Sequence, residues 1–72
     1  MTVLGAIQYL MEKFDNPEEP VFILRGRDTL APAVVLRWAE SAEEKGVGEK
    51  KVCDAIKVSN SMRKWPVRRL PD

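Results

Sequence analysis

Residues 21–32 read VFILRGRDTLAP, and this stretch decides how the rest of the chain is arranged. Its first four residues are apolar and mostly β-branched or aromatic, and Pro20 and Gly26 bound the run closely. A continuous apolar run of this length is typical of a strand that is covered on both faces. The Arg-Gly-Arg-Asp turn then leads to Pro32, and proline favours the first position of a helix. The stretch therefore predicts a short buried strand over 21–25, followed by a helix.

A lone buried strand needs a partner, because backbone amides and carbonyls that lack hydrogen bonds are costly to bury. The sequence offers two candidates. One is the C-terminal tail, residues 66–70, whose valine and leucine can face the core. The other is the same strand of a second subunit. We favour the tail as the partner.

The apolar spacing predicts three helices, at about 2–14, 31–45 and 49–64. Thr2 is the expected N-cap of the first helix. Pro17 and Pro66 are expected to end the first and third helices, and Gly46 suits the left-handed position after the second. The fold class is therefore predicted to be α+β, mainly α, in a single small domain that spans residues 1–72.

Each predicted helix carries an apolar stripe at helical spacing, which we interpret as its core-facing side. The three stripes consist of Val3, Leu4, Ile7, Leu10, Met11 and Phe14; of Ala31, Val35, Trp38, Ala39 and Ala42; and of Val52, Ala55, Ile56, Ser59 and Met62.

The small size and the composition limit how this domain can be stabilised. The chain has 72 residues, one cysteine (Cys53) and no histidine. We therefore expect neither an internal disulfide nor a zinc site. Small domains without these supports often associate, and we expect a homodimer or a larger homo-oligomer instead of a monomer. The single cysteine and the lack of a signal peptide or spanning segment predict a soluble protein of a reducing, cytoplasmic compartment, with no membrane partner.

The sequence predicts a non-enzymatic protein without cofactors. Histidine-based acid–base chemistry is impossible here, and Cys53 has no evident activating base, which favours a structural role. The neighbouring carboxylates at 18–19 and 43–44 are expected to face solvent, and they lack the apolar surroundings that would make one of them a general acid.

Charge is balanced overall but not along the chain. Twelve basic and eleven acidic residues give a net charge of +1, so no overall field recruits nucleic acid. The acidic segment 12–19 and the basic segment 63–69 could pair within one chain or across a dimer.

Two basic sets are candidate partner- or ligand-binding sites. Arg25 and Arg27 stand beside a helix start, where they could hold a carboxylate, a phosphate or an acidic loop; Asp28 is expected to cap the helix and to pair with one of them. The second set is in the tail and consists of Arg63, Lys64, Trp65, Arg68 and Arg69. It either binds single-stranded nucleic acid by stacking and charge, or uses the tryptophan to close the core.

The hairpin at 42–57 has the spacing of a helix-turn-helix motif, in which Lys50, Lys51 and Lys57 would meet DNA phosphates. Acidic residues on both helices argue against this interpretation. Any tight helical hairpin with a glycine turn would give the same spacing.

The order of residues from Val21 onward resembles a group of short uncharacterised proteins encoded by bacteriophages and prophages. The pattern consists of Phe22-Ile-Leu-Arg25, Asp28, Leu30-Ala-Pro32, Val35, Trp38-Ala39, Met62, Trp65-Pro66, Arg68 and Pro71-Asp72. The resemblance implies a bacterial host cytoplasm and binding of a host component, but no catalytic residues. We therefore expect an accessory protein that binds a host protein, for example as an inhibitor of a defence or transcription component. The alternatives are DNA or RNA binding through the hairpin or the tail, and binding of a nucleotide or another anionic small ligand.

Overall fold

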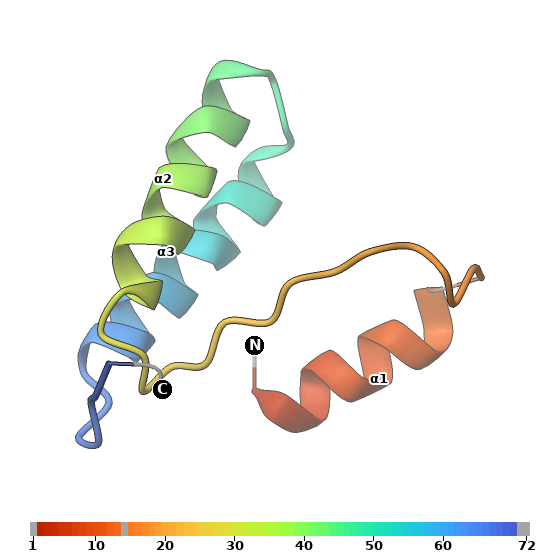
Figure 1. The fold of residues 1–72 in the computed structure, drawn as a ribbon. Coiled ribbons are helices and arrows are strands. Elements are labelled where there is room, and N and C mark those ends of the chain that lie inside the picture. The colour runs from red at the N-terminus through yellow and green to blue at the C-terminus, as the bar shows by residue number, and fades with distance from the viewer. Residues whose placement is uncertain (1, 14, 71–72) are drawn as a thin grey trace.

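The computed structural model describes residues 2–13 and 15–70 and contains three helices. These are α1 (Val3–Lys13), α2 (Ala31–Glu44) and α3 (Glu49–Arg63). Helices α2 and α3 form an antiparallel hairpin, whereas α1 stands apart at the end of a long extended segment (Figure 1). The prediction of a mainly helical chain is confirmed. Phe14, Pro71 and Asp72, which the predicted first helix and the phage-type pattern include, lie outside the described residues.

The predicted strand over 21–25 is wrong, and with it the α+β class. No strand is present in the described residues, and the β-type pairing found there is an isolated parallel bridge between Asp28 and Arg69. The apolar run is extended but uncovered, since Phe22 is 87% exposed and Ile23 is 76% exposed. The tail was predicted to pair along 21–25, but it pairs instead beyond the arginine turn, through Arg27, Thr29 and Arg69. The run therefore never acquires the cover that a buried strand requires.

Local signals in the sequence set the ends of the helices. The Thr2 hydroxyl accepts a hydrogen bond from the Gly5 amide at 3.1 Å, which is the predicted N-cap of α1. Gly46 adopts φ +83° after α2, a conformation that glycine reaches without the steric cost of a Cβ atom. Asp28 does not cap α2, whose N-cap is Leu30. The Asp28 carboxylate instead accepts from the Leu30 amide at 2.8 Å, so it stabilises the turn before the helix.

Small residues bring α2 and α3 into contact. The buried residues of the hairpin are Ala31, Pro32, Ala39, Ala42, Val52 and Ser59, and Ala55 and Ile56 pack against them. The Ser59 hydroxyl is 1% exposed and donates to the Pro32 carbonyl at 2.8 Å. This hydrogen bond satisfies the buried hydroxyl, as a polar group in a core requires.

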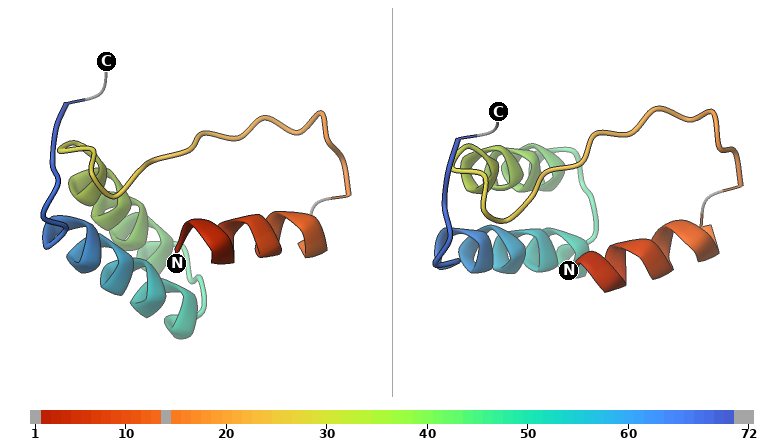
Figure 2. Two further views of the ribbon diagram at one scale, coloured as in Figure 1. Left: turned by 90° about the horizontal axis from the view of Figure 1, so that it is seen from below. Right: turned by 60° about the horizontal axis from the view of Figure 1, so that its bottom comes forward.

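Helix α1 contributes nothing to this core. It contains no buried residue, and among the described residues no Cα of α1 comes within 8 Å of a Cα of α2 or α3. In both views of Figure 2, α1 points away from the hairpin. The predicted core role of the first apolar stripe is therefore wrong for a single chain. Trp38, also predicted in the core, is about half exposed.

Candidate functional site

Arg68 fixes the C-terminal tail against the base of the hairpin. Its guanidinium donates to the Gly26 and Asp28 carbonyls, each at 3.1 Å, and also to the Met62 carbonyl. Three chain segments meet at this one side chain: the turn before α2, the last turn of α3 and the tail itself. The planar fork of an arginine suits such a role, because it presents five donors in fixed directions.

A short parallel pairing places Arg69 beside the central turn. The Arg69 amide donates to the Arg27 carbonyl at 2.8 Å, and the Thr29 amide donates to the Arg69 carbonyl at 3.1 Å. Residues that are far apart in the sequence thus lie side by side. This pairing places Arg69 of the tail set beside Arg27 of the turn set, whereas the other members of the two basic sets are not joined by it.

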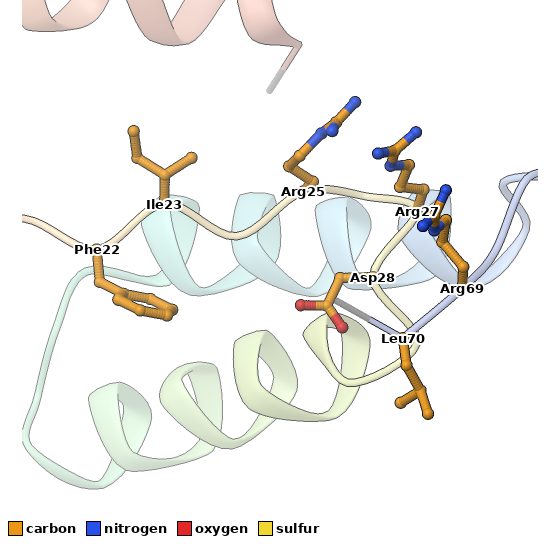
Figure 3. A pocket seen from close by; sticks show the side chains of 7 residues that line it. All are labelled: Phe22, Ile23, Arg25, Arg27, Asp28, Arg69 and Leu70. Atoms are coloured by element: carbon orange, nitrogen blue, oxygen red, sulfur yellow. The ribbon is translucent and has the colours of Figure 1, made fainter. Parts of the chain in front are cut away.

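An open hollow of about 280 Å³ lies at the junction of these segments. We name it the basic hollow, and its lining residues are Phe22, Ile23, Arg25, Arg27, Asp28, Arg69 and Leu70 (Figure 3). The side chains of Arg25, Arg27 and Arg69 lie on the same side of the chain in Figure 3. Arg25 and Arg27 belong to one tight turn, which the Asp28 amide closes by donating to the Arg25 carbonyl at 3.0 Å.

The hollow is electropositive, because three guanidinium groups stand there against one carboxylate. Neither Arg25 nor Arg27 forms a side-chain hydrogen bond or ion pair with any residue in the described ranges, so the predicted pairing of Asp28 with one of them is not formed. Arg27 is half-buried. Like charges held close together repel each other, and an anion that enters the hollow would relieve this repulsion.

Three apolar residues also line the hollow, and these were missed as site residues. In Figure 3 Ile23 points to the same side of the chain as the arginines, whereas Phe22 and Leu70 point to the other side. Phe22 and Ile23 were assigned to the buried strand, and Leu70 to its pairing partner. The signal that could have revealed them is the absence of a second strand-forming run in the sequence. The hollow therefore combines charge with exposed apolar area.

The remaining predicted residues do not line the hollow. Arg63 lies in the last turn of α3 and Trp65 follows the helix; both are exposed, so the tryptophan does not close the core. Lys50, Lys51 and Lys57 are exposed along α3, and the Lys50 ammonium lies 3.5 Å from the Asp54 carboxylate. Arg68 lines no part of the hollow, but it holds the neighbouring Arg69 in place.

The hairpin differs in shape from a helix-turn-helix motif. Helices α2 and α3 lie side by side along their lengths and run in opposite directions in both figures (Figures 1 and 2). The two helices of a DNA-binding helix-turn-helix cross at ~90–120° instead. This arrangement favours the tail over the hairpin as a surface for nucleic acid.

The predicted charge pairing between the acidic segment and the tail is not available within one chain. The loop after α1, with Asp15, Glu18 and Glu19, lies at the opposite end of the molecule from the tail (Figure 1). The acidic loop and the basic hollow are therefore both open to other molecules.

Comparison with protein-family models, with curated proteins and with solved structures finds no match for this chain. The part of the chain that the structure describes contains no cluster of three or more histidine, cysteine, aspartate or glutamate residues that could hold a metal ion. Within the same residues, no helix is long and apolar enough to cross a bilayer.

Proposed function

We propose that this chain is a non-enzymatic binding protein whose basic hollow takes up an acidic segment of a partner protein. The observation that supports this function most directly is the alignment of Arg25, Arg27 and Arg69 around one open depression (Figure 3). Guanidinium groups bind carboxylates through paired, charge-assisted hydrogen bonds. Two of these three groups have no other partner among the described residues.

The apolar border favours a peptide over a small anion. Phe22, Ile23 and Leu70 are all more than half exposed beside the arginines. A free nucleotide would leave most of this apolar surface in water, whereas a peptide with alternating acidic and apolar side chains could cover both kinds of surface. Clusters of arginine with aromatic neighbours are typical of binding hot spots in protein interfaces.

The wider setting that we propose follows from the phage-type pattern of the sequence. In that setting the protein acts in a bacterial cytoplasm as an accessory protein, and its partner is an acidic host protein, which it could inhibit. Single-stranded nucleic acid is the second candidate ligand, because Trp65 is exposed between basic residues of the tail. Bases stack on exposed aromatic side chains beside basic residues in proteins that bind single strands.

Fluorescence anisotropy with a labelled acidic peptide would test the proposal. The probe carries glutamates and leucines, and its control replaces each glutamate with glutamine. We expect binding of the acidic peptide alone, and an Arg27→Gln variant that weakens it ~10-fold or more, since a hydrogen bond to a charged group contributes about 1.5–3 kcal/mol. Lys57→Gln is the matched control, because it removes the same charge from an exposed position on α3.

Two results would contradict the proposed function. One is equal binding of the acidic and neutral peptides, or equal effects of the Arg27 and Lys57 variants. The other is tighter binding of a labelled oligothymidylate than of the acidic peptide, with an affinity that falls steeply as salt is raised. That second result would assign the basic residues to nucleic acid.

A further inference from the structure

The single chain exposes far more surface than a folded protein of its mass. Its accessible area is 6311 Å², whereas a compact monomer of 8.2 kDa exposes about 4,500 Å². The radius of gyration is 13.0 Å, against roughly 11 Å for a compact domain of this length. Helix α1 contains no buried residue and has no Cα within 8 Å of a Cα of α2 or α3, so it contributes to this excess of about 1,800 Å².

Helix α1 has a continuous apolar face with nothing on it. This face consists of Val3, Leu4, Ile7, Leu10 and Met11, all of which are exposed, and the spacing of three and four residues places them on one side. Glu12 lies on the other side, and Gln8 borders the apolar face between Leu4 and Met11. An isolated helix of 11 residues is marginal in water, because helices shorter than ~12–15 residues rarely persist without tertiary packing. Helix α1 therefore needs a surface to pack on.

The hairpin offers an apolar stripe of matching size. Leu30, Val34 and Trp38 follow one another at four-residue spacing at the start and along the outer side of α2, so they share a face. Each is about half exposed. We name these three residues the α2 stripe; it lies beside the buried Ala42, which follows Trp38 by four residues.

We infer that α1 of one copy of this chain packs its apolar face on the α2 stripe of a second copy, in a symmetric homodimer with exchanged helices. The linker supports exchange over packing within one chain. After a turn at residues 16–19, which the Glu19 amide closes by donating to the Asn16 carbonyl at 3.2 Å, residues 20–25 form an extended linker between α1 and the hairpin (Figure 2). Pro17 and Pro20 stiffen this path by fixing their φ angles. An extended arm is what an exchanged element requires.

The area also points to a second copy instead of a small ligand or peptide. An excess of ~1,800 Å² on each chain amounts to ~3,600 Å² for two copies. This total lies within the range of obligate homodimers, which bury about 2,000–5,000 Å² in total and have apolar interfaces. A twofold dimer forms the α1 contact twice, so both exposed apolar faces of both copies become covered. The inference does not depend on the proposed function, because no residue of the basic hollow belongs to the α1 face or to the α2 stripe.

Sedimentation velocity of the full chain over a range of concentrations would test the dimer. We expect a dimer that Ile7→Glu converts to monomer, with a rise in the dissociation constant on the order of a thousandfold, because each dimer loses two buried isoleucines. Glu12→Lys changes the charge on the opposite face of α1 and should leave the dimer unchanged. Circular dichroism and retained binding of the acidic peptide would show that the Ile7 variant keeps its hairpin and its hollow. A monomer at all concentrations, or equal effects of both variants, overturns the inference.

A cysteine pair distinguishes exchange from packing within one chain. In a Cys53→Ser background, Ile7→Cys and Val34→Cys together should give a covalent dimer on mild oxidation, visible on a non-reducing gel. Each single substitution should give far less of it. A covalent monomer closed by an internal disulfide would overturn the exchange, and so would equal cross-linking by the single variants.

Discussion

Arg68 provides the sharpest test of how this small fold is held together. Its guanidinium joins the turn at Gly26 and Asp28 to the last turn of α3 at Met62. Arg68→Ala removes all three hydrogen bonds and leaves three carbonyls to find water. Because the arginine is only partly buried, solvent can reach these carbonyls in the variant, which reduces the penalty for losing their partners.

The expected loss follows from these contacts. Hydrogen bonds that involve a charged group contribute about 1.5–3 kcal/mol when they are well buried, and partial exposure brings the sum for this site to about 2–4 kcal/mol. A domain of this length has a total unfolding free energy of roughly 4–11 kcal/mol. For domains of this size, each 1 kcal/mol lowers Tm by about 4–8 °C, so we expect Tm to fall by ~10 °C or more.

Urea denaturation followed by circular dichroism measures this loss. Arg63→Ala is the matched control, because it removes the same charge from an exposed position near the same end of α3 and should change stability by no more than about 0.5 kcal/mol. Arg68→Lys keeps the charge but cannot reach all three carbonyls with one ammonium, and it should fall between the two. Equal stability of the Arg68→Ala and Arg63→Ala variants would refute the reasoning.

Three further predictions concern single positions. Gly46→Ala should destabilise the chain by about 1–2 kcal/mol, because its φ of +83° is costly for any residue with a Cβ atom; Gly48→Ser, at the N-cap of α3, should instead be neutral or stabilising by a few tenths of a kcal/mol. Ser59→Ala should cost about 1 kcal/mol by urea titration, since it removes the buried hydrogen bond to the Pro32 carbonyl; no measurable change would mean that this hydrogen bond adds nothing to the hairpin. The exposed thiol of Cys53 should react fully with a thiol reagent under native conditions without loss of helicity, and a thiol that reacts only in denaturant would contradict its exposed position.

The parts of the fold that the sequence predicted well are those set by local chemistry. The three helices begin and end within one residue of the predicted positions where the structure describes them, because Thr2, Gly46 and the prolines act on their own neighbours. The α3 stripe was also correct, since Val52 and Ser59 are buried and Ala55, Ile56 and Met62 are half-buried. A helical period is a property of the sequence itself, and tertiary contacts were not needed to find it.

The errors concern what each apolar segment packs against. Residues 21–24 have the composition of a covered strand, but composition does not identify the cover, and the chain supplies none. The same holds for α1. Its apolar residues do share one side of the helix, as predicted, but they are not buried in the core of their own chain. The tail was recognised as the pairing partner, yet its register was wrong, because the position of Arg68 among three carbonyls is a tertiary property.

Only some residues of the basic hollow were predicted, because the sequence reveals which residues are neighbours along the chain but not which residues the fold brings together. Arg25, Arg27 and Asp28 are neighbours in the sequence, so their proximity required no knowledge of the fold. Arg69 joins them only through its backbone pairing with Arg27 and Thr29, about 40 residues away. Phe22, Ile23 and Leu70 were interpreted as core, and their exposure makes them candidates for binding instead.

The distribution of apolar residues connects these features. The buried contact between α2 and α3 is made largely by alanines and one serine, which bury little area each and stabilise a hairpin modestly. The large side chains lie outside it, on α1, on the α2 stripe and around the basic hollow. Exposed apolar area of this extent is typical of surfaces that act in association. A chain that places its small residues inside and its large ones outside gains most of its hydrophobic stabilisation when it associates, so folding and binding are linked by mass action. The two proposals assign separate roles to these surfaces: the arm of α1 would complete the fold with a second copy, and the basic hollow would bind an acidic partner.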